Sequence, residues 1–121
     1  MQITLYGIPN CDTVRKARAW LAENGIDYRF HDFKKAGVSA ELLRAWLACM
    51  PWDALLNRRG TTWRGLPEAR REAVVDADSA ITLMMESASL IKRPVLAASD
   101  EVHVGFSAEQ YEQLFGRICS V

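Results

Sequence analysis

Residues 4–21 read TLYGIPNCDTVRKARAWL, and this stretch decides the fold. Its β-favouring start predicts a strand over residues 2–6, and the GIPN sequence that follows contains turn-forming residues that end the strand. From Asp12 onward the apolar residues recur at helical spacing until Gly25, which suits a left-handed helix cap. The sequence therefore predicts a strand that passes through a short loop directly into a helix.

A second strand and a long helical stretch follow this helix. Residues 27–33 (DYRFHDF) alternate as a strand does, so we expect the first helix to connect two parallel strands in a right-handed βαβ unit. From residue 39 to about residue 88 the apolar residues recur every three or four positions, which predicts several short helices. Within this stretch the polar, glycine-containing segment NRRGTTWRG (residues 57–65) is predicted to be a surface loop.

Strand patterns return near the end of the chain. Residues 93–98 and 101–106 predict an antiparallel hairpin, and Ser107 with Gln110 fits a capping box that opens a final helix. The order βαβ, helices, ββα predicts an α/β fold in which one four-stranded mixed sheet carries an inserted helical region at about residues 39–90. We expect the whole chain to form a single domain.

Composition and charge exclude several classes of protein. The chain has 121 residues, of which half are hydrophobic and a quarter are charged, as is typical of a globular domain. Fifteen basic residues balance fifteen acidic ones, so no global field attracts nucleic acid or an anionic membrane. No apolar run approaches the ~20 residues that span a bilayer, and the N-terminus does not resemble a secretion signal. The expected location is the cytoplasm.

Cys11 is the leading candidate for chemistry because it lies between the exit loop of the first strand and the first turn of the helix. Unpaired backbone N–H groups and the helix dipole at such a position stabilise the thiolate, which is the nucleophilic form of cysteine. Arg15, one turn along the helix, either adds positive potential near the sulfur, as a substrate-binding candidate with Arg93, Arg59 and Pro94, or points to solvent. The alternative for Cys11 is a small packing residue, which its polar and turn-forming neighbours do not favour.

The other two cysteines, Cys49 and Cys119, lie on or beside apolar helix stripes and are predicted to be packing residues. Sequence spacing does not decide whether either sulfur reaches Cys11. The position that would complete a C-x-x-C pair with Cys11 is Val14. A local two-cysteine cycle is therefore excluded, and an external thiol must complete any redox cycle.

Arginines supply the candidate groups for binding an anion. Arg93 has a permanent charge and five donors, which suit a carboxylate, an oxyanion or a thiolate-bearing substrate, although a solvated strand end is the alternative. Pro94 follows it, and composition alone leaves their peptide bond trans. A further arginine cluster is either an anion site, a partner surface or a solvated face, and it consists of Arg58, Arg59, Arg64, Arg70 and Arg71. His31 and His103 have no ligand neighbours, so no metal site is expected.

The chain resembles the ArsC/Spx/YffB group, which comprises arsenate-reductase-related, thioredoxin-like proteins. The resemblance rests on four segments that occur in the order of the family, TLYGIPNCDTVRKARAWL, ALLNRRG, IKRPVL and HVGFSAEQYEQLF. Within the group, GIPNCDTVRKA and IKRPVL are most similar to the YffB branch. It implies a thioredoxin-like sheet and a cis peptide bond at Pro94, facing Cys11 as the nucleophile. It also implies that Arg93 and Arg59 hold the substrate, with Arg58 as the alternative to Arg59.

The resemblance further implies a function. The YffB branch suggests a glutathione-dependent thiol-disulfide reductase with a single nucleophilic cysteine, with no bound cofactor, glutathione as co-substrate and glutaredoxin as a further partner. Arsenate reduction is a weaker alternative, because residues 103–106 (HVGF) lack the third arginine of that enzyme. A regulator similar to Spx, which binds the α subunit of RNA polymerase, is another alternative, although the C-x-x-C switch of Spx is missing here.

Overall fold

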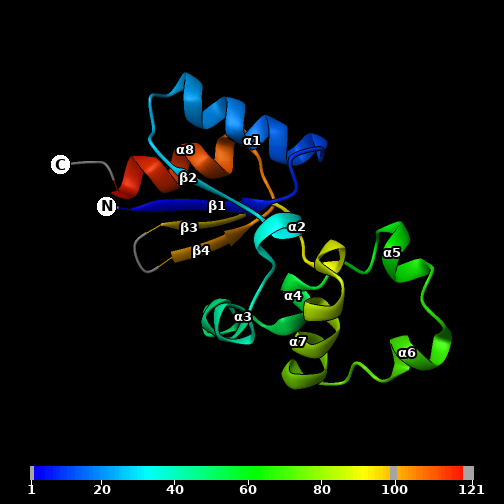
Figure 1. Ribbon diagram of the computed structural model, residues 1–121. Coiled ribbons are helices and arrows are strands. Elements are labelled where there is room, and N and C mark those ends of the chain that lie inside the picture. The colour runs from blue at the N-terminus through cyan, green and yellow to red at the C-terminus, as the bar shows by residue number, and fades with distance from the viewer. Residues whose placement is uncertain (1, 99–100, 119–121) are drawn as a thin grey trace. The chain divides into compact units, whose positions relative to one another are not determined.

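The structure is a computed structural model that describes residues 2–98 and 101–118. The chain divides into two compact units. Unit 1 holds the described residues up to His31 and from Arg93 onward, and unit 2 is Asp32–Lys92. In chain order the elements are β1 (Ile3–Gly7), α1 (Asp12–Glu23), β2 (Arg29–Asp32), α2 (Phe33–Ala36), α3 (Ala40–Leu47), α4 (Trp52–Leu55), α5 (Thr61–Arg64), α6 (Glu68–Glu72), α7 (Ala77–Glu86), the 3₁₀ helix η1 (Ala88–Leu90), β3 (Val95–Ala98), β4 (Glu101–Val104) and α8 (Ala108–Ile118) (Figure 1). None of the described helices has the length and apolar character that crossing a membrane requires.

Unit 1 is organised around a four-stranded sheet with the strand order β2-β1-β3-β4. β3 pairs antiparallel with both β1 and β4, whereas β2 runs in the same direction as β1 (Figure 1). The sheet is therefore mixed, as predicted, and the hairpin predicted near the end of the chain is confirmed as β3 and β4. Helices α1 and α8 cover one face of the sheet (Figure 1). This is the α/β arrangement that the sequence predicts, in the thioredoxin-like form that the family resemblance implies.

The core of unit 1 lies between the sheet and the helices α1 and α8. The alternation of β1 directs Ile3 and Leu5 into this core, and Leu5 pairs with Leu96 across the antiparallel register. The remaining buried members are Ala17, Leu21, Ala98, Tyr111, Leu114 and Phe115. Burial of this apolar surface holds α1 against β1 and so fixes the loop between them, in which Cys11 lies.

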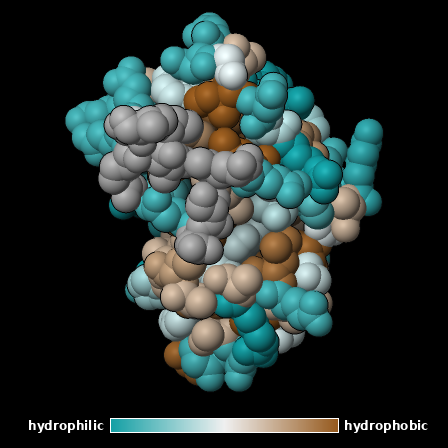
Figure 2. All heavy atoms as spheres, turned by 90° about the vertical axis from the view of Figure 1, so that its left-hand side faces the viewer, coloured by the Kyte–Doolittle hydropathy of each residue, from teal (hydrophilic) through white to brown (hydrophobic). Residues whose placement is uncertain are grey.

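Part of this core reaches the surface near the C-terminal ends of α1 and α8. Trp20 stacks on Phe115 with a ring-centroid distance of 5.7 Å, and both line a cavity of about 450 Å³ with Ile26. Figure 2 shows hydrophobic side chains in brown among hydrophilic ones in teal on this side of the molecule. Such partial exposure of aromatic residues is ordinary for a small domain.

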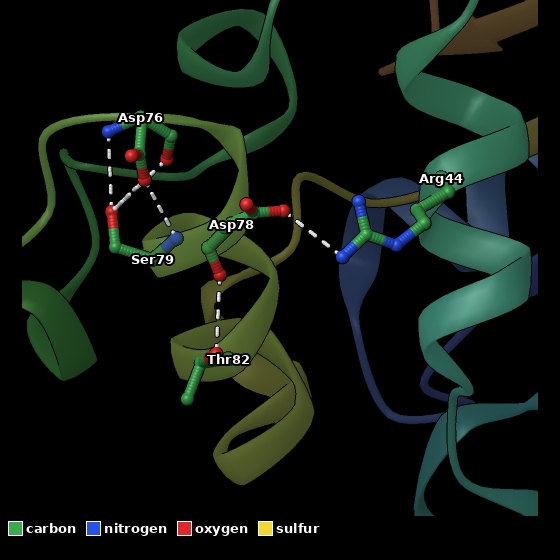
Figure 3. A network of polar contacts seen from close by, with 5 residues as sticks. All are labelled: Arg44, Asp76, Asp78, Ser79 and Thr82. Carbon is green, nitrogen blue, oxygen red and sulfur yellow. Dashed lines mark hydrogen bonds and ion pairs between the residues drawn. The ribbon is translucent and has the colours of Figure 1, made fainter.

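Unit 2 is built from the short helices that the apolar periodicity predicts. Leu43 and Trp46 of α3 are buried in the interior of this unit, and Arg44 forms an ion pair of 2.9 Å with Asp78 of α7 (Figure 3). An isolated antiparallel bridge joins Leu56, directly after α4, to Ile91 near the end of the unit. The predicted helical character of this region is confirmed.

Two local predictions were wrong. The segment predicted as a surface loop contains the helix α5, which starts after Gly60 and ends before Gly65. The second strand ends at Asp32 rather than at Phe33, because the Asp32 carboxylate accepts a 2.9 Å hydrogen bond from the Lys34 N–H and thereby caps α2. Local capping and short helical turns override the strand and loop preferences at these positions.

The predicted capping box before α8 is present only in part. Ser107 Oγ accepts a hydrogen bond of 3.0 Å from the Gln110 N–H, as expected. The Gln110 side chain, however, donates to the Val104 carbonyl at 3.4 Å. The glutamine therefore ties the start of α8 to the end of β4.

Candidate active site

Cys11 occupies the N-cap of α1 in an extended conformation, with φ −94° and ψ 128°. Its N–H donates to the Ile8 carbonyl at 3.2 Å, and its carbonyl accepts from the Arg15 N–H at 2.9 Å. The first bond closes the turn after β1 and the second begins the helix. The side chain is half-buried, so the sulfur lies at the surface edge of unit 1 and not in a dry apolar interior.

The surroundings of Cys11 lower the pKa of its thiol below the ordinary value. Burial acts in the opposite direction and raises the pKa. Cys11 makes no conventional capping hydrogen bond, but hydrogen bonding from the backbone of Val14 and Thr13 stabilises negative charge on the sulfur. The Arg93 side chain adds a hydrogen bond and a favourable charge interaction, and together these groups outweigh the burial.

Arg93 and Pro94 lie at the start of the chain segment that forms β3, and they belong to the same unit as Cys11. The peptide bond between them is cis, which confirms the form that the family resemblance implies. The Pro94 carbonyl accepts a hydrogen bond of 2.9 Å from the Gly105 N–H, and Gly105 has a φ of 79° that favours glycine. From this segment the Arg93 side chain reaches the sulfur of Cys11, with which it forms a hydrogen bond.

Arg15 interacts with residues around the start of α1. Its guanidinium donates to the Asp12 carboxylate at 2.9 Å and to the Asn10 carbonyl at 3.3 Å, and 60% of its side chain is exposed. Of the two predicted roles, these contacts fit the solvent-facing one. A pair this exposed contributes little to stability.

Arg59 lies in unit 2, in the turn before α5. Its backbone N–H donates to Asn57 Oδ1 at 3.1 Å, while its side chain lines a cavity of about 310 Å³. The other lining residues are Asp53, Leu56, Arg58 and Lys92. Three of the five lining residues are cationic, so this cavity suits an anion. The sequence analysis did not predict Lys92 or Asp53 as site residues. Lys92 directly precedes Arg93, and its charge could have indicated an anion site.

The five-arginine segment does not form one uniform basic patch. Arg70 forms an ion pair with Glu86, and Arg71 donates to the Arg64 carbonyl at 3.2 Å. Arg58 and Arg59 instead line the same cavity. Glu86, which neutralises Arg70, lies 16 positions away in the sequence. The sequence around the arginines therefore does not predict this ion pair.

The remaining candidates lie apart from this chemistry. Cys49 is exposed, which contradicts the expectation that it is a packing residue; α3 ends at Leu47, so Cys49 follows the helix instead of continuing its apolar stripe. Cys119 lies outside the described residues. The rings of His31 and Tyr6 are tilted against each other with a centroid distance of 4.9 Å, and His103 Nε2 lies 3.4 Å from Glu101 Oε1. Among the described residues no group of histidine, cysteine and acidic side chains is arranged to hold a metal ion.

Comparison with known proteins gives a consistent result along nearly the whole chain. The solution structure of an arsenate reductase (ArsC) related protein from Brucella melitensis is 54% identical, with a TM-score of 0.75 and 95% of each chain covered. A solved structure named YffB is 46% identical, with a TM-score of 0.88, and covers 93% of this chain and 97% of its own. The global transcriptional regulator Spx of Streptococcus pyogenes is 24% identical over 117 residues, which are 95% of this chain and 86% of Spx. The ArsC family model matches residues 6–114, and the chain belongs to the ArsC family.

Proposed function

We propose that this protein is a cytoplasmic thiol-disulfide reductase in which Cys11 is the nucleophile and glutathione is the co-substrate. The observation that carries the proposal is the half-buried Cys11 sulfur, whose pKa is lowered by backbone groups of α1 and by Arg93. A thiolate that persists toward neutral pH and remains accessible is what disulfide exchange requires. Membership of the ArsC family agrees with thiol chemistry at this position.

The proposed reaction has two exchange steps. The Cys11 thiolate attacks the glutathione sulfur of a mixed disulfide, forms a bond to it and releases the substrate as a thiolate. A glutathione thiolate then attacks the glutathione sulfur of that intermediate, which releases the Cys11 thiolate and oxidised glutathione. The two steps together convert the mixed disulfide and one free glutathione thiolate into the substrate thiolate and oxidised glutathione.

The arginines have separate roles in this proposal. Arg93 stabilises the thiolate before attack, and after attack its charge is available for a carboxylate of the bound glutathione. In unit 2, Arg59 and Arg58 offer cationic groups for carboxylates, and the family resemblance assigns substrate binding to Arg59. Arg15 is held by Asp12 and is not needed for the two steps.

The test compares Cys11→Ser with Cys49→Ser, which removes the exposed thiol outside the site. The assay follows glutathione-dependent reduction of hydroxyethyl disulfide, coupled to glutathione reductase. We expect Cys11→Ser to abolish turnover and Cys49→Ser to retain it, and intact mass after exposure to oxidised glutathione should show an adduct that requires Cys11. Equal turnover by Cys11→Ser would refute the proposal. Adding or omitting glutaredoxin in the second step determines whether it is a partner.

A regulatory role is the second candidate, because the relationship to Spx extends over 95% of the chain. Val14 is fully buried where Spx carries its second cysteine, so this chain lacks the disulfide switch. Recovery of an RNA polymerase α subunit in a pull-down, lost when Arg58 and Arg59 are replaced, would favour this role over the reductase. Arsenate reduction is disfavoured by the HVGF segment and predicts arsenate sensitivity when the gene is deleted.

A further inference from the structure

The last residue of β1 is a glycine, and it lies directly against Val14 in the first turn of α1. Gly7 is the last residue of β1, and its backbone is buried. A Cβ atom built on Gly7 would lie 2.8 Å from Cγ2 and 3.3 Å from Cγ1 of Val14. The first distance is shorter than real carbon contacts allow, so any other residue at position 7 requires a displacement.

Val14 cannot easily yield to such a contact by moving its side chain alone. It is fully buried, and a β-branched residue in a helix strongly prefers one rotamer. The displacement therefore falls on the backbone of the first turn of α1. That turn carries the Val14 and Thr13 backbone groups that stabilise negative charge on Cys11.

We propose that Gly7 is a positioning residue for Cys11. Because Gly7 has no side chain, the Val14 methyl groups pack against its backbone, and this contact fixes the position of the first turn of α1. This inference rests on the proposed role of Cys11 as the nucleophile. Gly7 itself touches neither substrate nor sulfur in this role. It acts through Val14, whose methyl groups any side chain at position 7 would displace.

The decisive experiment measures the pH dependence of Cys11 alkylation by iodoacetamide in a Cys49→Ser background, without glutathione or substrate. We expect Gly7→Ala to lower the rate near pH 7 by roughly threefold or more while leaving the rate at high pH unchanged, because less thiolate forms. Gly116→Ala is the matched control: Gly116 lies on the exposed side of α8 with no atom near its would-be Cβ, so the profile should not change.

A rescue variant separates positioning from general damage. Gly7→Ala with Val14→Ala removes both clashing methyl groups and keeps the Val14 backbone N–H, and the remaining Cβ contact of 3.7 Å is ordinary. Its alkylation profile should match that of Val14→Ala alone. If Gly7→Ala alone does not fold, the comparison of the double variant with Val14→Ala still tests the positioning role of Gly7.

Two outcomes overturn the inference. One is a folded Gly7→Ala protein with the wild-type profile, and the other is a double variant whose profile stays shifted from that of Val14→Ala. Since no turnover is measured, failure of the reductase proposal leaves these outcomes unaffected.

Discussion

At the residue scale, the Arg93 guanidinium acts together with backbone groups of α1 to lower the pKa of the candidate nucleophile, Cys11. The sequence predicted Cys11 and Arg93 individually from helix position and charge, and the family resemblance paired them. The hydrogen bond between them depends on how the chain enters β3 at Arg93. The sequence around either residue does not determine that geometry. The same limit applied to Arg15, whose two predicted roles differ only in side-chain direction.

Replacing Arg93 with glutamine should weaken the nucleophile at neutral pH. Loss of the hydrogen bond and charge raises the pKa of Cys11, so the alkylation rate near pH 7 should fall roughly three- to tenfold and converge with wild type at high pH. The lowered pKa of Cys11 also contributes to the stability of the fold: this contribution is complete above the ordinary thiol pKa and is lost as pH falls through the lowered value. Arg15→Gln is the control and should leave the profile unchanged. An unchanged Arg93→Gln profile would contradict the assignment.

Tyr111 gives a second test at this scale. Its ring is buried among Phe106, Trp20 and Phe115, and its hydroxyl has no hydrogen-bond partner among the described residues. Removing the hydroxyl in Tyr111→Phe should therefore be neutral or stabilise by about 1 kcal/mol in urea denaturation at pH 7. Tyr28→Phe, which loses a 3.0 Å hydrogen bond with Arg18, should instead destabilise by about 1 kcal/mol.

The pH dependence of Tyr111 has a defined sign. Burial raises its pKa, so its stabilising contribution is complete below the ordinary tyrosine pKa and is lost as pH rises through the raised value. Tyr111→Phe should accordingly retain more of its stability than wild type above about pH 10. A steeper alkaline loss in the variant would contradict the burial of this hydroxyl.

At the element scale, capping decides where several helices begin. The sequence predicts α1 and α8 because the helical period repeats several times along them, and β1 and the β3–β4 hairpin because strand alternation has a period of only two residues. It missed α5 because four residues do not reveal a period, and it extended β2 too far because Asp32 was read as part of an alternation instead of as a cap. Short elements are set by single hydrogen bonds, which composition does not show.

Asp76 is the clearest cap to test. Its side chain accepts from the Ser79 N–H at 2.9 Å, and Ser79 Oγ accepts from the Asp76 N–H at 3.1 Å, which forms a capping box (Figure 3). Asp76→Ala should lower the thermal midpoint at pH 7, whereas Asp76→Asn should keep most of the stability because asparagine also caps well. Equal losses in the two variants would contradict the cap.

The charge of Asp76 adds a pH dependence to this cap. Hydrogen bonding from Ser79 lowers the pKa of its carboxyl, so the charged cap stabilises α7 above the ordinary carboxyl pKa. That contribution is lost as pH falls through the lowered pKa. The difference between wild type and Asp76→Asn should therefore shrink in acid, as thermal unfolding across pH would show.

At the scale of the whole molecule, the chemistry and the helical region are divided between two units. The sequence predicted the helical insertion, but not the strand order, because the pairing of β1 with β3 joins residues about 90 positions apart. The candidate nucleophile and every group that lowers its pKa belong to unit 1. Arg58 and Arg59 belong to unit 2.

This division predicts that stability and nucleophile acidity can be separated. Trp46→Ala in unit 2 removes a side chain that is only 2% exposed and should cost about 3–5 kcal/mol of unfolding free energy. The pH profile of Cys11 alkylation in the folded variant should nevertheless match wild type. Met85→Ala, at a side chain that is 47% exposed, should change neither property appreciably. A shifted profile in folded Trp46→Ala would show that unit 2 acts on the sulfur.

The buried valine at position 14 also has a kinetic consequence for the proposed reaction. With no second sulfur in the first turn of α1 to expel a bound glutathione, the lifetime of the adduct is set by how much free thiol surrounds the protein. Abundant thiol clears the adduct quickly, whereas oxidative stress prolongs it. The fraction of protein capped at Cys11 would then record the recent redox history of its compartment.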